Sequence, residues 1–199
     1  FRQKGVTYQK KTAQEWRNDR TYIYTANAQA YRLFTLALAG QPDKGAMNRL
    51  RESKDIPNLS RWLLAAAYAT TGRPEVAGDL LDIRNIETEK DYYGYYYGSM
   101  IRDKSIILYT LTLLKNMEQA VPLLNEICED LNKDTWYSTQ SIAWGLFSYM
   151  KWAELVPGDK NKPLKLKIDF NGDKTDQTIS GKQLWNKNLT IKGGTNTLS

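Results

Sequence analysis

Hydrophobic residues in the middle of the chain recur at intervals of three and four positions, the spacing of one face of an α-helix. The first clear example comprises Ala26, Ala30, Leu33 and Ala37, and Gly40 stops it. The same pattern returns three more times before residue 155. The middle of the chain is therefore expected to be α-helical.

The long predicted helices begin near residues 26, 59, 99 and 138, a repeat of 33, 40 and 39 residues. A shorter, more charged helix is expected after each of the first three. A period of this length is typical of stacked helical hairpins. Two architectures fit the pattern: an open solenoid, or hairpins that close into an α/α toroid.

Single residues indicate where several helices begin and which sides face the core. Asn58 or Ser60 can cap one long helix, and Ser138 or Thr139 can cap the last. Pro74 suits the first turn of a short helix. In the last two helices, the rows expected to face the core are Val121, Leu124, Cys128 and Leu131, and then Ile142, Leu146, Tyr149 and Ala153.

The pattern changes after residues 156–158, Val-Pro-Gly. Apolar and polar residues alternate over 164–170, which predicts a half-buried strand, and Asn171-Gly172 predicts a tight turn. Further strands are expected at 189–191 and from 195 to 198. Because so few strands do not make an independent sheet, we expect the other strands of this β-domain to lie outside the chain.

Three segments result: a polar N-terminal segment 1–20, expected to be a loop or a weak hairpin; a helical-hairpin region 21–155; and a β-segment 156–199. The fold class is mainly α, with a short and incomplete β-segment. Segments 1–20 and 156–199 each carry a net charge of +4, whereas 21–155 carries −2. Because the basic excess lies at the two ends and not on the helical region, no nucleic-acid partner is expected.

Composition excludes several kinds of chemistry. The sequence has no histidine and one cysteine, so it has no Ser-His-Asp or Cys-His nucleophile, His-ligated metal or internal disulfide. We expect no cofactor and no metal, and Cys128 is interpreted as a buried structural residue. No apolar run of 18 residues occurs, so no membrane contact is expected from this segment.

One turn has the spacing of a calcium loop. Asp169, Asn171 and Asp173 match the first three ligand positions, but Lys174 and Ser180 stand where the loop needs glycine and glutamate. A hairpin turn explains these residues better.

Arg102-Asp103 lies at the start of a predicted helix, where a structural role is expected. A catalytic Asp103 would need a second acid such as Glu87, Glu89 or Asp91. The tyrosines of residues 92–97 are expected to pack between helix ends, although they could also stack on a sugar or a peptide.

Five stretches resemble the bacterial α2-macroglobulin family, in particular its Bacteroidetes-type form, and they occur in the family's order. They are 30–40 (AYRLFTLALAG), 45–52 (GAMNRLRE), 61–68 (RWLLAAAY), 98–103 (GSMIRD) and 138–140 (STQ). The resemblance covers about residues 26–155. It implies the later half of the family's thioester domain, an α/α toroid of the terpenoid-cyclase kind, and then the first strands of a CUB-like β-sandwich.

The resemblance assigns scaffold roles but no catalytic, cofactor, metal or thioester residue. The family's reactive motif is Cys-x-Glu-Gln, whereas Cys128 is followed by Glu129, Asp130 and Leu131. Nine residues are interpreted as family-motif scaffold, and one of them, Trp136, lies in the aromatic connection just before the last motif. They are Tyr31, Trp62, Ser99, Arg102, Asp103, Trp136, Ser138, Thr139 and Gln140.

The function implied by the resemblance is inhibition of endopeptidases by trapping, in the periplasm or cell envelope. The implied partners are proteases, through the full-length protein, and neighbouring β-domains of the same chain. Two alternatives remain open: an α/α-toroid enzyme acting on glycans or polyprenyl substrates, and a helical-repeat scaffold that binds peptides.

Overall fold

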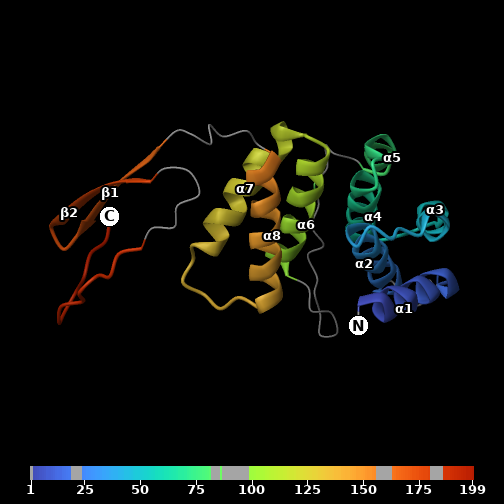
Figure 1. The fold of residues 1–199 in the computed structure, drawn as a ribbon, viewed down its shortest axis with the longest axis horizontal. Helices are drawn as coiled ribbons and strands as arrows, with labels where there is room; N and C mark the ends of the chain where they lie inside the picture. The colour runs from blue at the N-terminus through green and yellow to red at the C-terminus, as the bar shows by residue number, and fades with distance from the viewer. Residues whose placement is uncertain (1, 19–23, 82–85, 87–98, 156–162, 180–185) are drawn as a thin grey trace. The chain divides into compact units, whose positions relative to one another are not determined.

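The computed structural model describes residues 2–18, 24–81, 86, 99–155, 163–179 and 186–199 (Figure 1). Eight α-helices and one two-stranded sheet lie in these residues. The chain divides into two compact units, Phe1–Leu155 and Val156–Ser199, and each is described by itself. The prediction of a mainly helical chain is confirmed.

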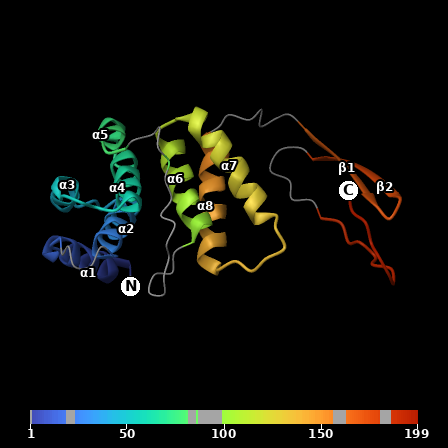
Figure 2. The same cartoon turned by 180° about the vertical axis from the view of Figure 1, so that it is seen from behind.

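Long and short helices alternate in the first unit. The helices are α1 (Arg2–Glu15), α2 (Tyr24–Leu38), α3 (Lys44–Glu52), α4 (Asn58–Thr70), α5 (Pro74–Asp79), α6 (Met100–Leu113), α7 (Met117–Leu131) and α8 (Thr139–Leu155). The long helices α2, α4, α6 and α8 pack against one another in chain order, while α3, α5 and α7 pack against their long neighbours. Figures 1 and 2 show α6, α7 and α8 side by side from both directions.

The turns that follow α2, α4 and α6 share one geometry. The second residue after each helix, Gly40, Gly72 or Lys115, is left-handed, with φ of 70°, 77° and 57°. In each turn the next amide donates to the carbonyl five residues earlier: Gln41 to Leu36, Arg73 to Tyr68 and Asn116 to Leu111. This is the Schellman motif, which satisfies the last carbonyls of a helix. The helical hairpins therefore repeat in the geometry of their turns as well as in the spacing of their sequence.

The centre of the helical unit is formed by α4 and α6. Consecutive residues are buried in both helices, including Leu63 and Leu64 in α4 and Ile107 and Leu108 in α6. A helix that is apolar on most sides is stable only when neighbours cover it on most sides. α4 and α6 meet this condition because each lies between two other long helices.

The N-terminal segment is helical, and the prediction of a loop or weak hairpin is wrong. α1 has few apolar residues, but Ala13 is fully buried against the following helices. The buried Gln29 of α2 donates its Nε2 to the Ala13 carbonyl at 3.0 Å and accepts from Arg32 at 2.6 Å. Arg32 also donates to Gln9 at 2.9 Å. These polar contacts between helices left no signal in the hydrophobic pattern.

The predicted core-facing row of α7 is confirmed only in part, and that of α8 is wrong. In α7 the fully buried residues are Ala120, Leu123 and Ile127, while Leu124 and Leu131 of the predicted row are partly buried against the core. Cys128 is exposed, so its interpretation as a buried structural residue is wrong. The fully buried row lies one residue before the predicted one. Periodicity did not distinguish the two rows, because the residues of both are largely apolar.

In α8 the core is contacted by Ser141, Trp144, Gly145 and Ser148, with Trp152 partly buried. The predicted row of Ile142, Leu146, Tyr149 and Ala153 is exposed instead. α8 turns the side with small residues toward the core because the packing there is close. A Cβ atom at Gly145 would lie only 3.1 Å from the side chain of Leu131.

The cap predicted for α4 is not observed, whereas the cap predicted for α8 is, at Ser138. α4 starts at Asn58 after Pro57 without a side-chain cap, and Ser60 instead donates to Asn27 of α2 at 2.5 Å. Ser99 caps α6 by accepting from the Arg102 amide, and Ser138 caps α8 by accepting from the Ser141 amide. Pro74 stands in the first turn of α5, as predicted.

The second unit contains an antiparallel hairpin of β1 (Leu164–Phe170) and β2 (Asp173–Ile179), with Leu164 opposite Ile179. Asn171 and Gly172 form its turn with φ of 54° and 89°, and the Asp169 carboxylate accepts from the Gly172 amide. This contact confirms the turn interpretation of Asp169.

The C-terminal residues run beside β1. Phe170 bridges to Leu198, and the amide and carbonyl of Ser199 bond to those of Asp169. The strand expected to begin within 195–198 is thus partly confirmed. The strand expected at 189–191 is wrong, since these residues have no strand pairing.

Candidate functional site

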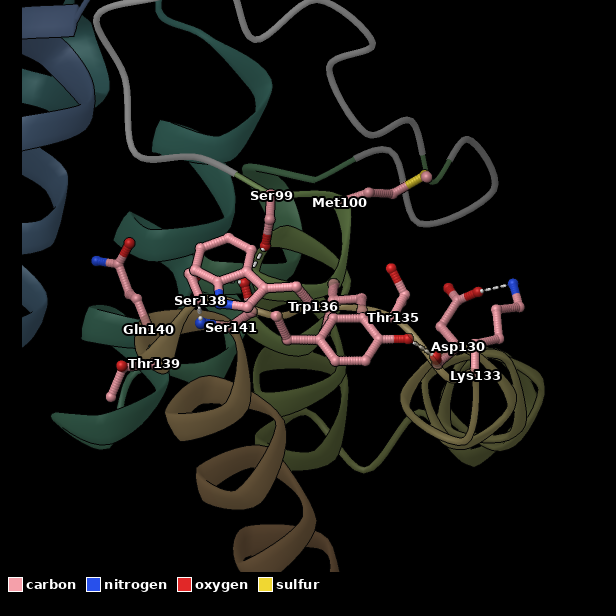
Figure 3. Close-up of a pocket in the computed structure, with 12 residues that line it drawn as sticks. Ser99, Met100, Asp130, Lys133, Thr135, Trp136, Ser138, Thr139, Gln140 and Ser141 are labelled. Carbon is pink, nitrogen blue, oxygen red and sulfur yellow. Dashed lines mark hydrogen bonds and ion pairs between the residues drawn. The ribbon is translucent and has the colours of Figure 1, made fainter.

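A pocket of about 760 Å³ lies where the first turns of α6 and α8 meet. Its walls come from residues 99–101, from the end of α7, and from the connection to α8 with its first turn. Figure 3 shows Asp130 and Lys133 at one side of the pocket and Thr139 and Gln140 at the other. Ser99 and Ser141 meet between them although they are 42 residues apart.

Three serine hydroxyls form a chain at the base of this pocket. The Oγ atoms of Ser99 and Ser141 are 2.6 Å apart, and those of Ser138 and Ser141 are 2.8 Å apart. Ser99 and Ser138 each also accept a backbone amide as helix caps. The two hydrogen bonds between these three hydroxyls use two of their three protons. The third O–H, on whichever serine carries it, can donate to another acceptor.

The backbone at the pocket adds further donors. The amides of Met100 and Ile101 begin α6, and those of Thr139 and Gln140 begin α8, so none has an acceptor within its helix. The positive ends of two helix dipoles therefore point toward the same region. The pocket suits hydrogen-bond acceptors better than donors.

The outer wall is aromatic. Trp136 is 84% exposed, more than any other large apolar side chain of the described residues. Tyr137 is more enclosed, and its hydroxyl donates to the Asp130 carbonyl. One ring thus fastens the connection to α7, while the other presents its face to solvent.

Asp130 is the centre of a charged network beside the pocket. Lys133 and Lys104 approach its two carboxylate oxygens at 2.6 and 3.1 Å, and Lys104 also pairs with Glu126 at 3.1 Å. The hydrogen bond from Lys133, with a smaller contribution from Lys104, lowers the pKa of Asp130. Burial alone would lower the pKa of Lys104, but its bonds to Glu126 and Asp130 outweigh burial and raise it.

Arg102 and Asp103 lie behind the pocket wall in the core. Both are almost fully buried, and the Arg102 guanidinium contacts the Asp103 carboxylate. This placement agrees with a structural interpretation. The proposed acidic partners at 87, 89 and 91, and the tyrosines at 92–97, lie outside the described residues.

The pocket gathers five of the nine predicted scaffold residues: Ser99, Trp136, Ser138, Thr139 and Gln140. Trp62 lies elsewhere, fully buried in α4. Tyr31 is a half-exposed residue of α2 whose ring meets Trp144 edge-on at 6.0 Å.

Tyr31 belongs to an aromatic cluster that sequence analysis missed. Trp144 stacks near Phe34 at 5.9 Å and meets Phe147 edge-on at 5.6 Å, while Tyr109 stacks on Phe147 at 4.9 Å. The cluster joins α2, α6 and α8. Its members are too far apart in sequence to form a motif.

The pocket lining supplies hydroxyls, helix amides and one lysine. The serine hydroxyls bond to one another, and Lys133 pairs with Asp130. Cys128 is exposed on α7 and does not line the pocket. Within the described part of the chain, no three His, Cys, Asp or Glu residues gather as a metal site would need. The same residues contain no helix long and apolar enough to cross a membrane.

Comparison of the structure with solved structures gives two similar folds. One is the native conformation of Escherichia coli α2-macroglobulin, with a TM-score of 0.60 and 20% sequence identity over 89% of this chain and 11% of that chain. The other is the same E. coli protein activated by porcine elastase, with a TM-score of 0.56 and 17% identity over 89% and 16% of the two chains.

This chain has an α2-macroglobulin-like fold. It spans about a tenth to a sixth of the α2-macroglobulin chains that it matches. The sequence itself matches no family profile and no curated protein. The α2-macroglobulin-like fold favours neither the glycan or polyprenyl enzyme nor the peptide-binding scaffold.

Proposed function

We propose that this chain is part of a protease-trapping inhibitor of the α2-macroglobulin type, located in the bacterial periplasm or cell envelope. Its helical unit would form the later part of an α/α toroid, the thioester domain, and its strands would begin a CUB-like β-domain. The observation that carries the proposal is the similarity to both native and elastase-activated α2-macroglobulin over 89% of the chain.

In this proposal the chain is framework and the reactive group lies elsewhere. Cys128 is exposed on α7 and lacks the Glu-Gln sequence that a thioester would need. The serine chain joins the starts of α6 and α8, and the Arg102–Asp103 pair is buried in the first turn of α6, so both would support the helical layer. The parent polypeptide would contact proteases, and this chain would contact the neighbouring β-domains.

The test uses the natural polypeptide that contains the chain, mixed with porcine elastase. Trapping should suppress cleavage of a large protein substrate and leave cleavage of a short peptide substrate largely intact, because a caged active site still admits small molecules. The same polypeptide, unfolded by heat before mixing, is the control. Equal cleavage of both substrates in the presence of the folded polypeptide would contradict the proposal.

Pre-treatment with methylamine separates the two ways of trapping. If the parent carries a thioester, methylamine should abolish the covalent elastase adduct seen on a denaturing gel. A parent without the thioester should form no such adduct and still protect the large substrate.

A further inference from the structure

The turn of the β-hairpin carries the one Asn-Gly pair of the sequence, Asn171-Gly172. Such a pair can react with itself, because glycine has no Cβ to obstruct the approach of its amide nitrogen to the asparagine side chain. The glycine amide loses its proton to solvent, its nitrogen bonds to the side-chain carbonyl carbon, and the side-chain nitrogen leaves as ammonia. Water then opens the resulting succinimide to aspartate or isoaspartate.

Both reacting groups are held by other partners in the folded chain. The Asn171 side chain donates its Nδ2 to Oδ1 of Asn196 at 2.9 Å and accepts from the Thr197 amide at 2.8 Å. The backbone amide of Asn171 also donates to the Thr197 carbonyl at 3.0 Å. The attacking nitrogen, that of Gly172, donates to the Asp169 carboxylate at 2.9 Å. The attack therefore requires that several hydrogen bonds break first.

The side-chain amide of Asn196 has only one orientation that fits its surroundings. Its Nδ2 donates to the carbonyls of Lys192 and Gly194 at 2.9 and 3.1 Å, and its Oδ1 accepts from the Lys192 amide at 3.1 Å. Turning the amide over would set its oxygen against two carbonyl oxygens. Asn196 therefore presents an acceptor to residue 171, and an ionised carboxylate at 171 would have no hydrogen to donate to it.

We infer that Asn171 is a site of spontaneous deamidation, that the bonds from Asn196 and Thr197 keep this reaction slow in the folded chain, and that the product loosens residues 195–199 from β1. Aspartate would bring a carboxylate oxygen against Oδ1 of Asn196 in place of the Nδ2 donor. Isoaspartate would also lengthen the backbone of the turn. Both changes weaken the attachment that continues to Asp169 through Ser199. The inference is independent of the proposed function.

The rate of deamidation in the natural polypeptide that contains the chain tests the protection. The reaction is followed at mildly alkaline pH by mass spectrometry of the peptide around residue 171, in native buffer and in urea. The parent should react at least about tenfold more slowly in native buffer, since reaction then requires local opening. Asn196→Ala should speed the native reaction at least about fivefold, because the Nδ2 of Asn171 loses its acceptor.

Leu198→Ala is the matched control, because it changes the same segment without removing a hydrogen bond to Asn171. Its native rate should equal that of the parent. A parent that reacts equally fast in native buffer and in urea would overturn the inference, as would equal native rates for the parent and Asn196→Ala. Equal acceleration in both variants would also overturn it, because loosening of the whole segment would then be the cause.

Asn171→Asp tests the effect of the product. Hydrogen exchange of the amides of residues 195–199, measured by mass spectrometry in the natural polypeptide, should be at least about fivefold faster than in the parent. Asn188→Asp adds the same charge at an exposed position of the same unit and should leave this exchange unchanged. Equal exchange in Asn171→Asp and the parent would overturn the predicted loosening.

Discussion

Arg102 and Asp103, neighbours in sequence at the start of α6, form an ion pair inside the core. The Nη2 and Nε atoms of Arg102 lie 2.7 and 2.8 Å from the same carboxylate oxygen, Oδ1. Only 5% of Arg102 and 2% of Asp103 is exposed. The pair places two opposite charges where either charge alone would be costly.

Replacing Asp103 by Asn should therefore be strongly destabilising. The guanidinium would stay buried without the Asp103 carboxylate, and the loss of one member of a buried ion pair typically costs about 3–5 kcal/mol. The free energy of unfolding in urea, followed by circular dichroism at pH 7, measures the effect. The double variant Arg102→Met, Asp103→Leu removes both charges and should cost less than Asp103→Asn. A loss below about 1 kcal/mol for Asp103→Asn would show that the buried charge is compensated in another way.

The shared turn geometry predicts that glycine at the left-handed position raises the free energy of unfolding and that a larger residue there lowers it. Lys115 occupies the left-handed position that Gly40 and Gly72 occupy in the other hairpins. Lys115→Gly should raise the free energy of unfolding by about 0.5–1 kcal/mol, because a side chain is unfavourable there.

Gly72→Ala is the matched counterpart and should lower the free energy of unfolding by about 1 kcal/mol. A Cβ at this position would contact nothing within 4 Å, so the cost would come from the backbone alone. Thermal unfolding of both variants beside the parent chain measures the pair. A stabilising Gly72→Ala would contradict the turn geometry.

Trp136 in the pocket wall and Trp144 in the aromatic cluster should differ in their effect on stability. Trp144 is 6% exposed within the aromatic cluster, so Trp144→Ala should cost about 3–5 kcal/mol. Trp136 is mostly exposed, and Trp136→Ala should change stability by no more than about 0.5 kcal/mol. Urea unfolding of both variants tests the contrast. A similar loss for both would mean that Trp136 also packs in a core.

The charged network around Asp130 predicts a pH-dependent contribution. Its carboxyl pKa is lower in the folded chain, so the network stabilises the fold above the unfolded value of about 3.9 and is lost as pH falls through the folded pKa. Asp130→Asn should lower the free energy of unfolding by about 0.5–1 kcal/mol at pH 7. The variant and the parent should converge at strongly acidic pH.

Glu129→Gln provides the control, since Glu129 is exposed on the neighbouring position of α7. Its unfolding midpoints across the pH range should follow those of the parent chain. A constant difference between Asp130→Asn and the parent down to acidic pH would show that charge is not the cause.

Helix periodicity predicted the hairpin repeat well because each long helix has a continuous apolar row that ends at a turn. It failed where the most apolar row of a helix is not the buried one. In α8, the row through Leu146 is apolar but exposed, whereas the buried row through Trp144 contains the small polar residues Ser141 and Ser148, which let α8 approach α6. In α1 it failed for the opposite reason, since polar contacts such as Gln29 to Ala13 hold the helix in place.

The candidate site shows a similar limit. The sequence identified Ser99 and Ser138 as starts of helices, but nothing local indicates that their hydroxyls meet through Ser141. Their approach depends on how α6 and α8 cross. The pocket therefore follows from packing, and the aromatic cluster of three helices does so as well.

The three shared turns also bear on the order in which the helices assemble. α2 with α3, α4 with α5, and α6 with α7 are each joined by a short local turn, so each pair can form without waiting for distant parts of the chain. Among the described helices, α8 has no partner joined to it by such a turn, because it packs mainly on α6 and the whole of α7 lies between them in sequence. We therefore expect α8 to dock after the hairpins have formed and to be the first long helix to detach when the layer opens.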